Sequence, residues 1–130
     1  MAFKAEMKLG DKTYRIMSCS YGFHRSIDQY GKPQTRTQGG TISIMVESTT
    51  DTSLSDWMFN DFEHKDGEIT FYKTDTDAAA KTLKFTNSSL IDFQESFDAN
   101  GGTAMYASVV ISAEKIQIGD GELDNAWVEG

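Results

Sequence analysis

Alternation between apolar and polar residues constrains the fold of this chain more than any other feature. In the first segment, lysine or glutamate separates four apolar residues, Phe3, Ala5, Met7 and Leu9. A period of two places every second side chain on one face, which is the pattern of a half-buried β-strand. The pattern returns, with varying regularity, in residues 13–23, 41–47, 68–73, 81–86, 89–97, 103–114 and 116–118. We therefore expect a mainly β protein with about seven or eight antiparallel strands.

One segment breaks the strand pattern and predicts a helix over residues 54–65. Ser53 precedes it as the N-cap, and Asp66-Gly67 follows as a stop signal. Four apolar residues fall on one helical stripe, namely Leu54, Trp57, Met58 and Phe62. Strands with one helix inserted after the third strand favour a small antiparallel barrel or sandwich with the helix against one side. The length of 130 residues fits a single domain spanning residues 1–130.

The connection between the second and third strands is longer than an antiparallel pair requires. A two-residue turn would suffice, whereas a loop of about a dozen residues is usually functional or disordered. The polar part, residues 28–40, contains Pro33, the only proline of the chain. We call residues 24–40 the arm; its charged residues are three cations and one acid, Arg25, Lys32, Arg36 and Asp28. In a chain with a net charge of −8, this basic segment predicts a contact with a neighbouring molecule.

Acidic residues dominate two other parts of the sequence. Residues 47–68 contain seven acids and one base, Lys65, and residues 119–130 add four more acids. Opposite charges on different patches of one subunit favour head-to-tail contacts, which close into rings or continue as filaments. Charge segregation alone leaves a simpler alternative open, in which the acidic face is only solvated. The overall acidity, with a pI of about 4.6, argues against a nucleic-acid partner.

The remaining composition excludes several classes of protein. No apolar run reaches the roughly 18 residues that a membrane-spanning helix needs, so we expect no membrane insertion. The first residues alternate in polarity and lack the continuous apolar core of a signal peptide, which predicts cytoplasmic synthesis without a conventional export signal. A single cysteine, Cys19, rules out an intramolecular disulfide. Nucleotide-binding and zinc-binding motifs are missing, so we expect no enzyme, no metal and no cofactor.

Binding of a hydrophobic ligand inside the barrel is an alternative function, since small antiparallel barrels do hold ligands. Six aromatic residues supply enough bulk to fill a short-stranded barrel: Phe71, Phe85, Phe93, Phe97, Tyr106 and Trp57. We therefore expect a packed interior and rank a ligand-binding barrel below an assembly protein.

Short motifs of a known family run through nearly the whole chain in a specific order and spacing. They are Tyr14-Arg-Ile-Met-Ser-Cys-Ser-Tyr, Asp28 with Gly31-Lys-Pro33, Gly39-Gly-Thr-Ile42, Trp57-Met58, Gly67-Glu-Ile-Thr-Phe-Tyr72, Glu95-Ser-Phe-Asp98 and Trp127. With these motifs the chain resembles the Hcp (haemolysin-coregulated protein) family of type VI secretion systems, in the form found in Bacteroidetes. The resemblance implies an antiparallel β-barrel with one flanking helix, assembled as hexameric rings that stack into a hollow tube. The resemblance further implies that a contracting sheath expels this tube, which carries effectors.

The resemblance also implies a role for the arm, because in this family the loop between the second and third strands projects toward the next ring. The corresponding stacking residues are Asp28, Gln29, Tyr30, Gly31, Lys32, Pro33, Gln34 and Arg36. Lys32 stands where the family pattern has arginine, which keeps the charge and gives up bidentate pairing. For ring closure we expect edge strands and the helix region, with contacts from Trp57, Met58 and Phe59.

The implied partners are further copies of the chain, the sheath, spike and baseplate proteins of the secretion machine, and the secreted effectors. Assembly would take place in the cytoplasm, and the contractile apparatus would then secrete the tube without a signal peptide. Phage tail-tube proteins share the fold, so a tube protein of a related phage-like contractile injection particle is the alternative.

Overall fold

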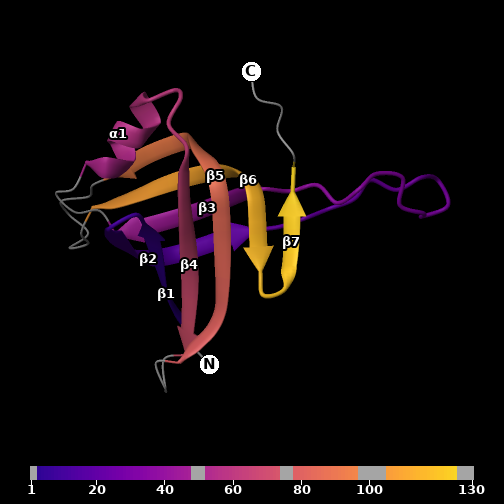
Figure 1. Ribbon diagram of the computed structural model, residues 1–130, viewed down its shortest axis with the longest axis horizontal. Helices are drawn as coiled ribbons and strands as arrows, with labels where there is room; N and C mark the ends of the chain where they lie inside the picture. The colour runs from indigo at the N-terminus through magenta and orange to yellow at the C-terminus, as the bar shows by residue number, and fades with distance from the viewer. Residues whose placement is uncertain (1–2, 48–51, 74–77, 97–104, 126–130) are drawn as a thin grey trace.

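A computed structural model of the chain describes residues 3–47, 52–73, 78–96 and 105–125 (Figure 1). Within these residues the backbone forms seven strands and one helix. In chain order they are β1 (Phe3–Leu9), β2 (Lys12–Tyr21), β3 (Thr41–Glu47), α1 (Ser53–Phe59), β4 (Lys65–Lys73), β5 (Ala79–Ser96), β6 (Tyr106–Ile118) and β7 (Gly121–Asp124). The prediction of a mainly β fold with a single helix is confirmed.

Six of the seven described strands close into an antiparallel barrel. They are hydrogen-bonded in the order β3-β2-β1-β4-β5-β6, and β3 also pairs with β6, which joins the two ends of the sheet. β7 continues the sheet from the C-terminal half of β6 and lies outside the barrel (Figure 1). Because closure pairs both edges of the sheet, the backbone polar groups along those edges are satisfied within the chain.

β5 is longer than the sequence pattern predicts. Separate strands are expected over residues 81–86 and 89–97, whereas the structure has one 18-residue strand that pairs with β4 in its first half and with β6 over most of its length. Asn87 adopts a positive φ of 55° within it. The Asn87 N–H donates to Asp66 Oδ1 at 2.8 Å, and Asn87 Nδ2 donates to Glu114 Oε1 at 2.8 Å. These bonds let the strand bend without ending, since asparagine tolerates left-handed backbone.

The C-terminal part of the sheet also differs from the prediction. Residues 103–114 and 116–118 are expected to form separate strands, but β6 runs without a break over Tyr106–Ile118. A turn at Gly119 and Asp120 then returns the chain as β7, a strand that the sequence pattern does not predict. Gly119 has a φ of +58°, a conformation that glycine adopts without steric cost. The acidic segment of residues 119–130 therefore contains a strand, directly after this turn.

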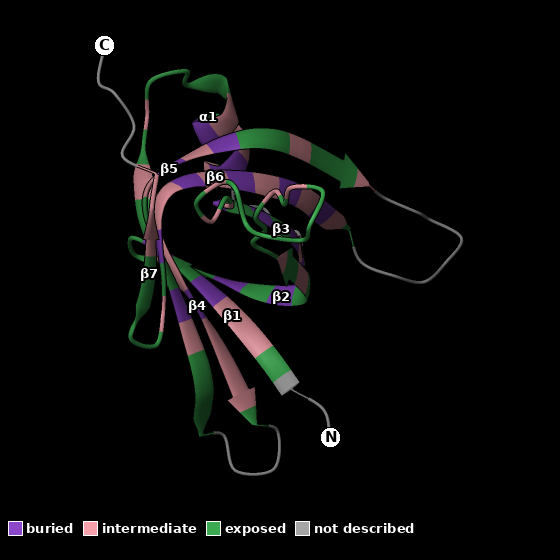
Figure 2. Cartoon of the chain, turned by 90° about the vertical axis from the view of Figure 1, so that its right-hand side faces the viewer, coloured by how far each residue is buried: buried purple, intermediate pink, exposed green. Residues whose placement is uncertain are grey.

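Apolar side chains fill the interior of the barrel, and the alternation predicted from the sequence is confirmed in β3 and β6. Figure 2 shows buried residues alternating with less buried ones along β6. The most deeply buried apolar side chains are Trp57, Phe85, Met7, Ile42, Ile69, Leu83, Ile111, Ile116, Val46 and Val109. Of the other aromatic residues expected inside, Phe71 and Phe93 are partly buried against this core, Tyr106 is half-buried, and Phe97 lies outside the described residues.

A β-bulge in β5 interrupts the alternation of its side chains. By alternation alone, Ile91 and Phe93 would share one face of the strand. The register between β5 and β6 shifts between Leu90 and Asp92, which inserts one extra residue into β5. The shift places Ile91 and Phe93 on different sides of the strand, so Phe93 is partly buried against the core whereas Ile91 is 52% exposed. β2 has a similar shift between Ile16 and Ser18, and Met17, which lies there, is 53% exposed.

The helix is shorter than the sequence pattern predicts. α1 covers Ser53–Phe59, where a helix over residues 54–65 is expected. Its N-cap is Thr52 rather than Ser53, and the last residue of the predicted helix, Lys65, is already the first residue of β4. Within the described part of the chain, no helix is long and apolar enough to cross a membrane.

Two hydrogen bonds explain why the helix ends at Phe59. The Asn60 N–H donates to the Trp57 carbonyl at 3.1 Å, which closes the last turn. The Trp57 indole Nε1 donates to the Glu63 carbonyl at 3.0 Å and thereby holds the following turn against the indole ring. Phe62, expected on the buried stripe, consequently stands on the surface and is 89% exposed.

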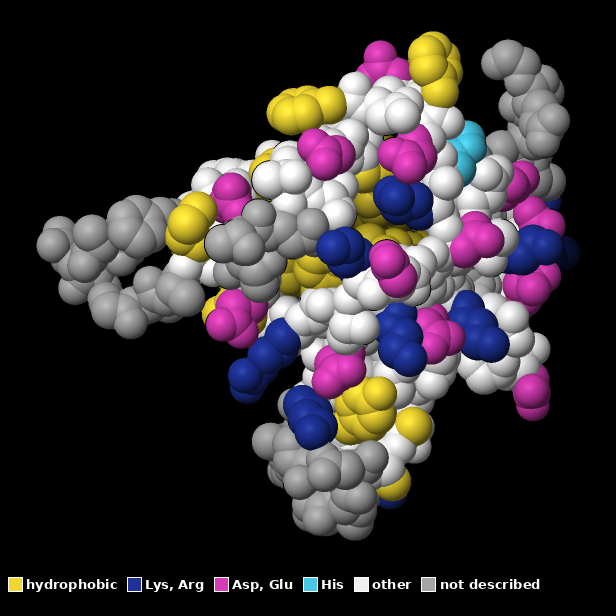
Figure 3. Space-filling model, turned by 60° about the vertical axis from the view of Figure 1, so that its left-hand side comes forward, with side chains coloured by type: hydrophobic (Ala, Val, Ile, Leu, Met, Phe, Trp, Pro, Cys, Tyr) yellow, Lys and Arg dark blue, Asp and Glu magenta, His cyan; other side chains and the backbone are white. Residues whose placement is uncertain are grey.

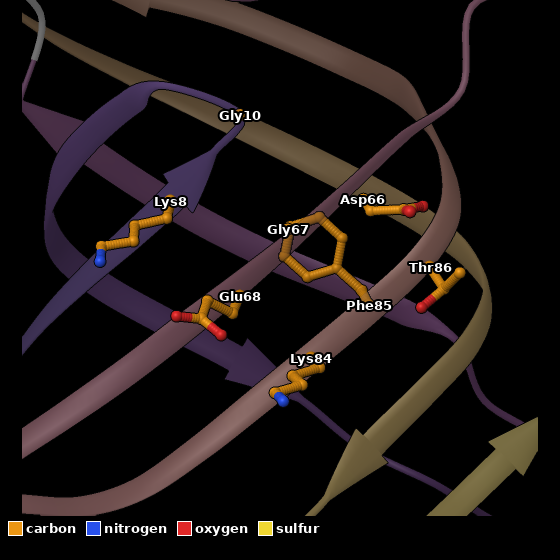
Figure 4. Close-up of a pocket in the computed structure, with 8 residues that line it drawn as sticks. All are labelled: Lys8, Gly10, Asp66, Gly67, Glu68, Lys84, Phe85 and Thr86. Atoms are coloured by element: carbon orange, nitrogen blue, oxygen red, sulfur yellow. The ribbon is translucent and has the colours of Figure 1, made fainter.

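Gly67 lies where three strands approach one another. It falls within β4, although the sequence pattern predicts it as a helix stop. A Cβ atom added to Gly67 would lie 2.6 Å from the Phe85 ring and 2.7 Å from the Lys8 carbonyl oxygen. Figure 4 shows the Phe85 ring beside Gly67 in an open surface depression of about 390 Å³. Only a residue without a side chain fits between β1 and β5 at this point.

Replacing Gly67 by alanine should destabilise the barrel, because neither the carbonyl group nor the buried Phe85 ring can move away easily. We expect the free energy of unfolding, measured by urea titration, to fall by about 1–3 kcal/mol. Gly22→Ala is the matched control, since a Cβ at Gly22 meets no atom within 4 Å. Equal losses in the two variants would contradict the close-packing explanation.

Candidate functional site

The arm forms a narrow projection that leaves the barrel between β2 and β3 (Figure 1). In Figure 2 it points toward the viewer, away from the body of the barrel. α1 lies toward the opposite end of the longest axis of the molecule (Figure 1). The arm therefore extends into space that the barrel of its own subunit does not occupy.

The two limbs of the arm are hydrogen-bonded to each other. His24 and Gln38 exchange two backbone hydrogen bonds, of 2.9 and 2.7 Å. Further out, the Gln34 N–H donates to the Ser26 carbonyl at 2.9 Å, and the Ser26 N–H donates to Thr35 Oγ1 at 3.0 Å. These bonds make the arm an irregular hairpin rather than an open loop. A preformed hairpin loses less conformational entropy when it contacts a partner.

Asp28 organises the tip of the arm, residues 28–32. Its Oδ1 accepts hydrogen bonds from the Tyr30 N–H at 2.9 Å and from the Lys32 N–H at 3.0 Å. The Asp28 N–H donates to the Lys32 carbonyl at 2.9 Å, and the Gly31 N–H donates to the Asp28 carbonyl at 3.0 Å. Gly31 has a φ of +82°, which favours glycine. The spacing Asp28-x-x-Gly31 thus specifies a turn, in which the carboxylate binds its own backbone.

The tip and the residues next to it present apolar and aromatic surface to the solvent. Tyr30 is 85% exposed and Ile27 is 60% exposed. Pro33 lies opposite Ile27 in an isolated β-bridge, where it has no N–H to donate. Large exposed side chains at the end of an ordered projection are typical of a surface that contacts another molecule.

The cations of the arm keep their charge available to a partner. Arg25 Nε donates to Thr37 Oγ1 at 2.8 Å, and Arg36 Nη2 donates to the Asp124 carbonyl at 3.3 Å. Both acceptors are uncharged oxygens, so these bonds orient the guanidinium groups without neutralising them. The structure thus brings the predicted stacking residues together in one hairpin, while their contact with another ring stays a prediction.

The predicted ring contacts divide between the core and the surface. Trp57 is 1% exposed and packs inside its own subunit, so its side chain has almost no surface to offer a neighbour. Met58 is partly buried against the core, whereas Phe59 is 80% exposed. Trp57 is therefore corrected to a core residue, because its ring is enclosed and its N–H is bound to Glu63. For Met58 and Phe59, contact with a neighbour stays a prediction.

Phe62 is a surface residue that the helical pattern wrongly places on the apolar stripe of the helix. It follows Phe59 by three positions, and we call these two residues the aromatic pair. The Phe62 N–H donates to Asn60 Oδ1 at 3.1 Å, which orders the turn that carries it. Figure 3 shows hydrophobic side chains standing out from this side of the molecule beside acidic ones. The signal that could have revealed this turn is Asn60, since asparagine favours turns over helix interiors.

The described part of the chain offers neither a cluster of metal ligands nor an activated thiol. No group of three or more His, Cys, Asp or Glu side chains there could hold a metal ion. Burial raises the pKa of the Cys19 thiol to about 11, so this thiol stays protonated at neutral pH and is a weak nucleophile. The depression in Figure 4 is open, unlike an enclosed apolar ligand site. The charged residues that line it are Lys8, Asp66, Glu68 and Lys84.

Comparison with known proteins gives matches over nearly the whole chain. The family model of the hemolysin coregulated protein Hcp (TssD) matches residues 1–128. Among solved structures, Hcp1 from Flavobacterium johnsoniae is 41% identical, has a TM-score of 0.89, and the match covers 94% of this chain and 99% of that chain. Among functionally curated proteins, no sequence matches significantly.

More distant structures share the fold. Hcp1 from Salmonella typhimurium is 11% identical, with a TM-score of 0.74 over 95% of this chain and 92% of that one. A chain of the PVC sheath-tube complex, an extracellular contractile injection system, is 19% identical, with a TM-score of 0.58 over 88% of this chain and 86% of that one. At such low identities the likeness concerns the fold alone. The family model and the Flavobacterium structure decide the assignment: the chain belongs to the hemolysin coregulated protein Hcp (TssD) family.

Proposed function

We infer that this chain is the structural subunit of the inner tube of a type VI secretion system. The family match over residues 1–128, together with the 41% identity to a solved Hcp1 over nearly the full length of both chains, carries this inference. A further solved structure, described as a type six secretion system protein, shares the fold with a TM-score of 0.79. The role is structural: hexameric rings of the subunit stack into a hollow tube that a contracting sheath expels.

The arm provides the contact between stacked rings. It extends beyond the barrel, so it can reach a subunit that the barrel itself does not touch (Figure 1). Tyr30 and Ile27 bury apolar surface on that subunit, and Lys32 adds a positive charge beside them. A basic arm on a chain of net charge −8 also steers the approach of an acidic copy of the same chain.

Asp28 shapes this contact rather than forming a salt bridge across it. Both hydrogen bonds of its Oδ1 go to backbone N–H groups of its own arm. Stacking therefore does not require Asp28 to pair with a cation of the next ring. The lysine at position 32 fits this role, because an ammonium group serves as a single charge where a bidentate pair is not needed.

Neighbours within one ring meet at the helix end, through the aromatic pair and Met58. Phe59 and Phe62 are 80% and 89% exposed, although their backbone is ordered by the bonds of Asn60. Full burial of a phenylalanine side chain contributes about 1.5–3 kcal/mol, so two of them supply a large share of a subunit contact.

The sheath, spike and baseplate proteins and the secreted effectors are the partners that this role implies, and the tube leaves the cell through the contractile apparatus. A tube protein of a related injection particle is the second candidate, favoured by the match to the PVC sheath-tube complex over 88% of this chain. Release of the chain into the medium separates the two. Dependence on the host's type VI sheath gene supports the secretion system, and release without that gene supports the particle.

Replacing residues 25–37 with a short Gly-Ser turn should leave hexamers intact and abolish tubes, because the arm is lost while the His24–Gln38 pair at its base is kept. Light scattering at physiological and high salt measures the mass, and electron micrographs count the tubes. A mass near six subunits supports the ring. A 14.5 kDa monomer at every concentration would contradict the ring, and tubes formed by the variant would contradict the role of the arm.

Combining Phe59→Ser with Phe62→Ser should shift hexamers toward monomers, because the apolar contact within the ring is removed. We expect the dissociation constant between subunits, measured by sedimentation, to rise by about tenfold or more. Tyr30→Ser is the matched control, since Tyr30 is equally exposed but lies in the arm. It should leave the ring mass unchanged and weaken stacking. Rings of normal stability in the double variant would remove the aromatic pair from the interface.

Asp28→Asn should leave the tip of the arm intact, because asparagine keeps an Oδ1 acceptor for the Tyr30 and Lys32 N–H groups. Asp28→Ala removes this acceptor, and hydrogen exchange at those two amides should become about five- to tenfold faster. Nuclear magnetic resonance of the isolated subunit or ring measures these rates. If Asp28→Asn were as damaging as Asp28→Ala, the charge of the carboxylate would matter rather than the turn.

A further inference from the structure

The C-terminal end of β7 contacts the base of the arm, which is far from it in sequence. Asn125, the first residue after β7, donates from Nδ2 to the Gly39 carbonyl at 3.1 Å and to the Ala113 carbonyl at 3.3 Å. The Asn125 N–H donates to the Glu114 carbonyl at 2.8 Å, which continues the pairing of β7 with β6. One side chain thus joins β6, the end of β7 and the arm. We call the bonds from Asn125 to Gly39 and Ala113 the root contact.

We propose that Asn125 is a positioning residue, which sets the direction in which the arm leaves the barrel and thereby controls the stacking of rings. The proposal rests on the stacking role inferred above for the arm. Asn125 acts through the base of the arm, since its side chain binds the carbonyl of Gly39 and not the exposed tip around Tyr30. A small rotation at the base of a long projection produces a large displacement at its tip.

Two glycines leave room for the root contact. Gly40 has a φ of +112°, and a Cβ there would lie 2.7 Å from Asn125 Nδ2 and 2.8 Å from the Ala113 carbonyl oxygen. The Ala113 N–H donates to the Gly40 carbonyl at 2.7 Å. On the other side, a Cβ on Gly39 would collide with the ring of Phe23. The base of the arm is therefore held between Phe23 and Asn125.

β7 is itself bound to β6 and reaches the arm at a second point. Its residues Gly121 to Asp124 pair with Lys115 to Ile118 of β6. Lys115 Nζ lies 3.8 Å from Asp124 Oδ2. The Asp124 carbonyl accepts the hydrogen bond from Arg36 at 3.3 Å. Because Asp124 and Asn125 are consecutive, one short segment binds the limb of the arm that leads into β3 at two positions, Arg36 and Gly39.

The root contact requires a hydrogen-bond donor at position 125. Both partners of Asn125 Nδ2 are carbonyl oxygens, so an amide NH₂ group matches them and a carboxylate of the same size does not. Asn125→Asp places a charged acceptor beside two other acceptors, whereas Asn125→Ala only removes the bonds. A side chain that merely filled space would tolerate aspartate better than alanine. Which of the two variants has the larger effect therefore distinguishes a positioning role from a packing role.

The experiment compares Asn125→Asp and Asn125→Ala with the unchanged full-length chain. The hydrogen-exchange rates of the His24 and Gln38 amides report how well the base of the arm is ordered. Light scattering gives the protein concentration at which rings begin to stack. We expect the exchange rates and this concentration to rise by about tenfold in Asn125→Asp and by less in Asn125→Ala, with the ring mass unchanged. Glu122→Gln is the matched control, because Glu122 is an exposed residue of β7. It should change neither quantity.

The outcomes test the role of Asn125 separately from the proposed stacking role of the arm. Unchanged exchange in Asn125→Asp would overturn it, as would a larger effect of alanine than of aspartate. Faster exchange with normal stacking would overturn the link between the root contact and assembly. If the unchanged chain forms rings that never stack, the proposed role of the arm fails and the link to stacking fails with it, while the exchange rates in those rings still test whether Asn125 holds the arm.

Discussion

The pairing of β3 with β6 is the interaction on which the rest of the structure depends. Its register places three buried pairs opposite each other, Ile42 with Ile111, Ile44 with Val109, and Val46 with Ala107. These pairs close the sheet and bury its apolar face in one step, since a closed barrel has no open edge there. The arm returns directly into β3. Closure of the barrel therefore also determines where the base of the arm stands.

The arm and the aromatic pair are ordered by bonds within their own subunit before any partner arrives. In the arm, His24 and Gln38 pair across the two limbs, and Asp28 binds the tip. At the helix end, the indole of Trp57 and the amide of Asn60 hold the turn that exposes Phe62. Binding energy is then not consumed in ordering these segments, which is the advantage of preorganisation. A rigid barrel carrying ordered loops fits a subunit that repeats one contact many times.

The sequence predicts the parts of the fold that depend on local pattern and misses those that depend on distant contacts. Alternation identifies β1 and β3, and the length and charge of the connection between the second and third strands mark the arm. The bend in β5 relies on bonds from Asn87 to residues 21 and 27 positions away, and the root contact joins residues 86 positions apart. Periodicity carries no information about such pairs. The helix end is missed for a related reason, since Trp57 and Phe62 share a helical stripe only while the helix continues.

The position of β7 outside the barrel has a consequence for how copies of the chain meet. β7 has four residues and, among the described strands, pairs with β6 alone. An unpaired strand edge is a template for a strand from another chain, and this is a common start of aggregation. A short edge that carries Glu122 and Asp124 repels the same edge of another copy. Edge-to-edge pairing of two copies is thereby disfavoured, which leaves assembly to the other contacts that the subunit offers.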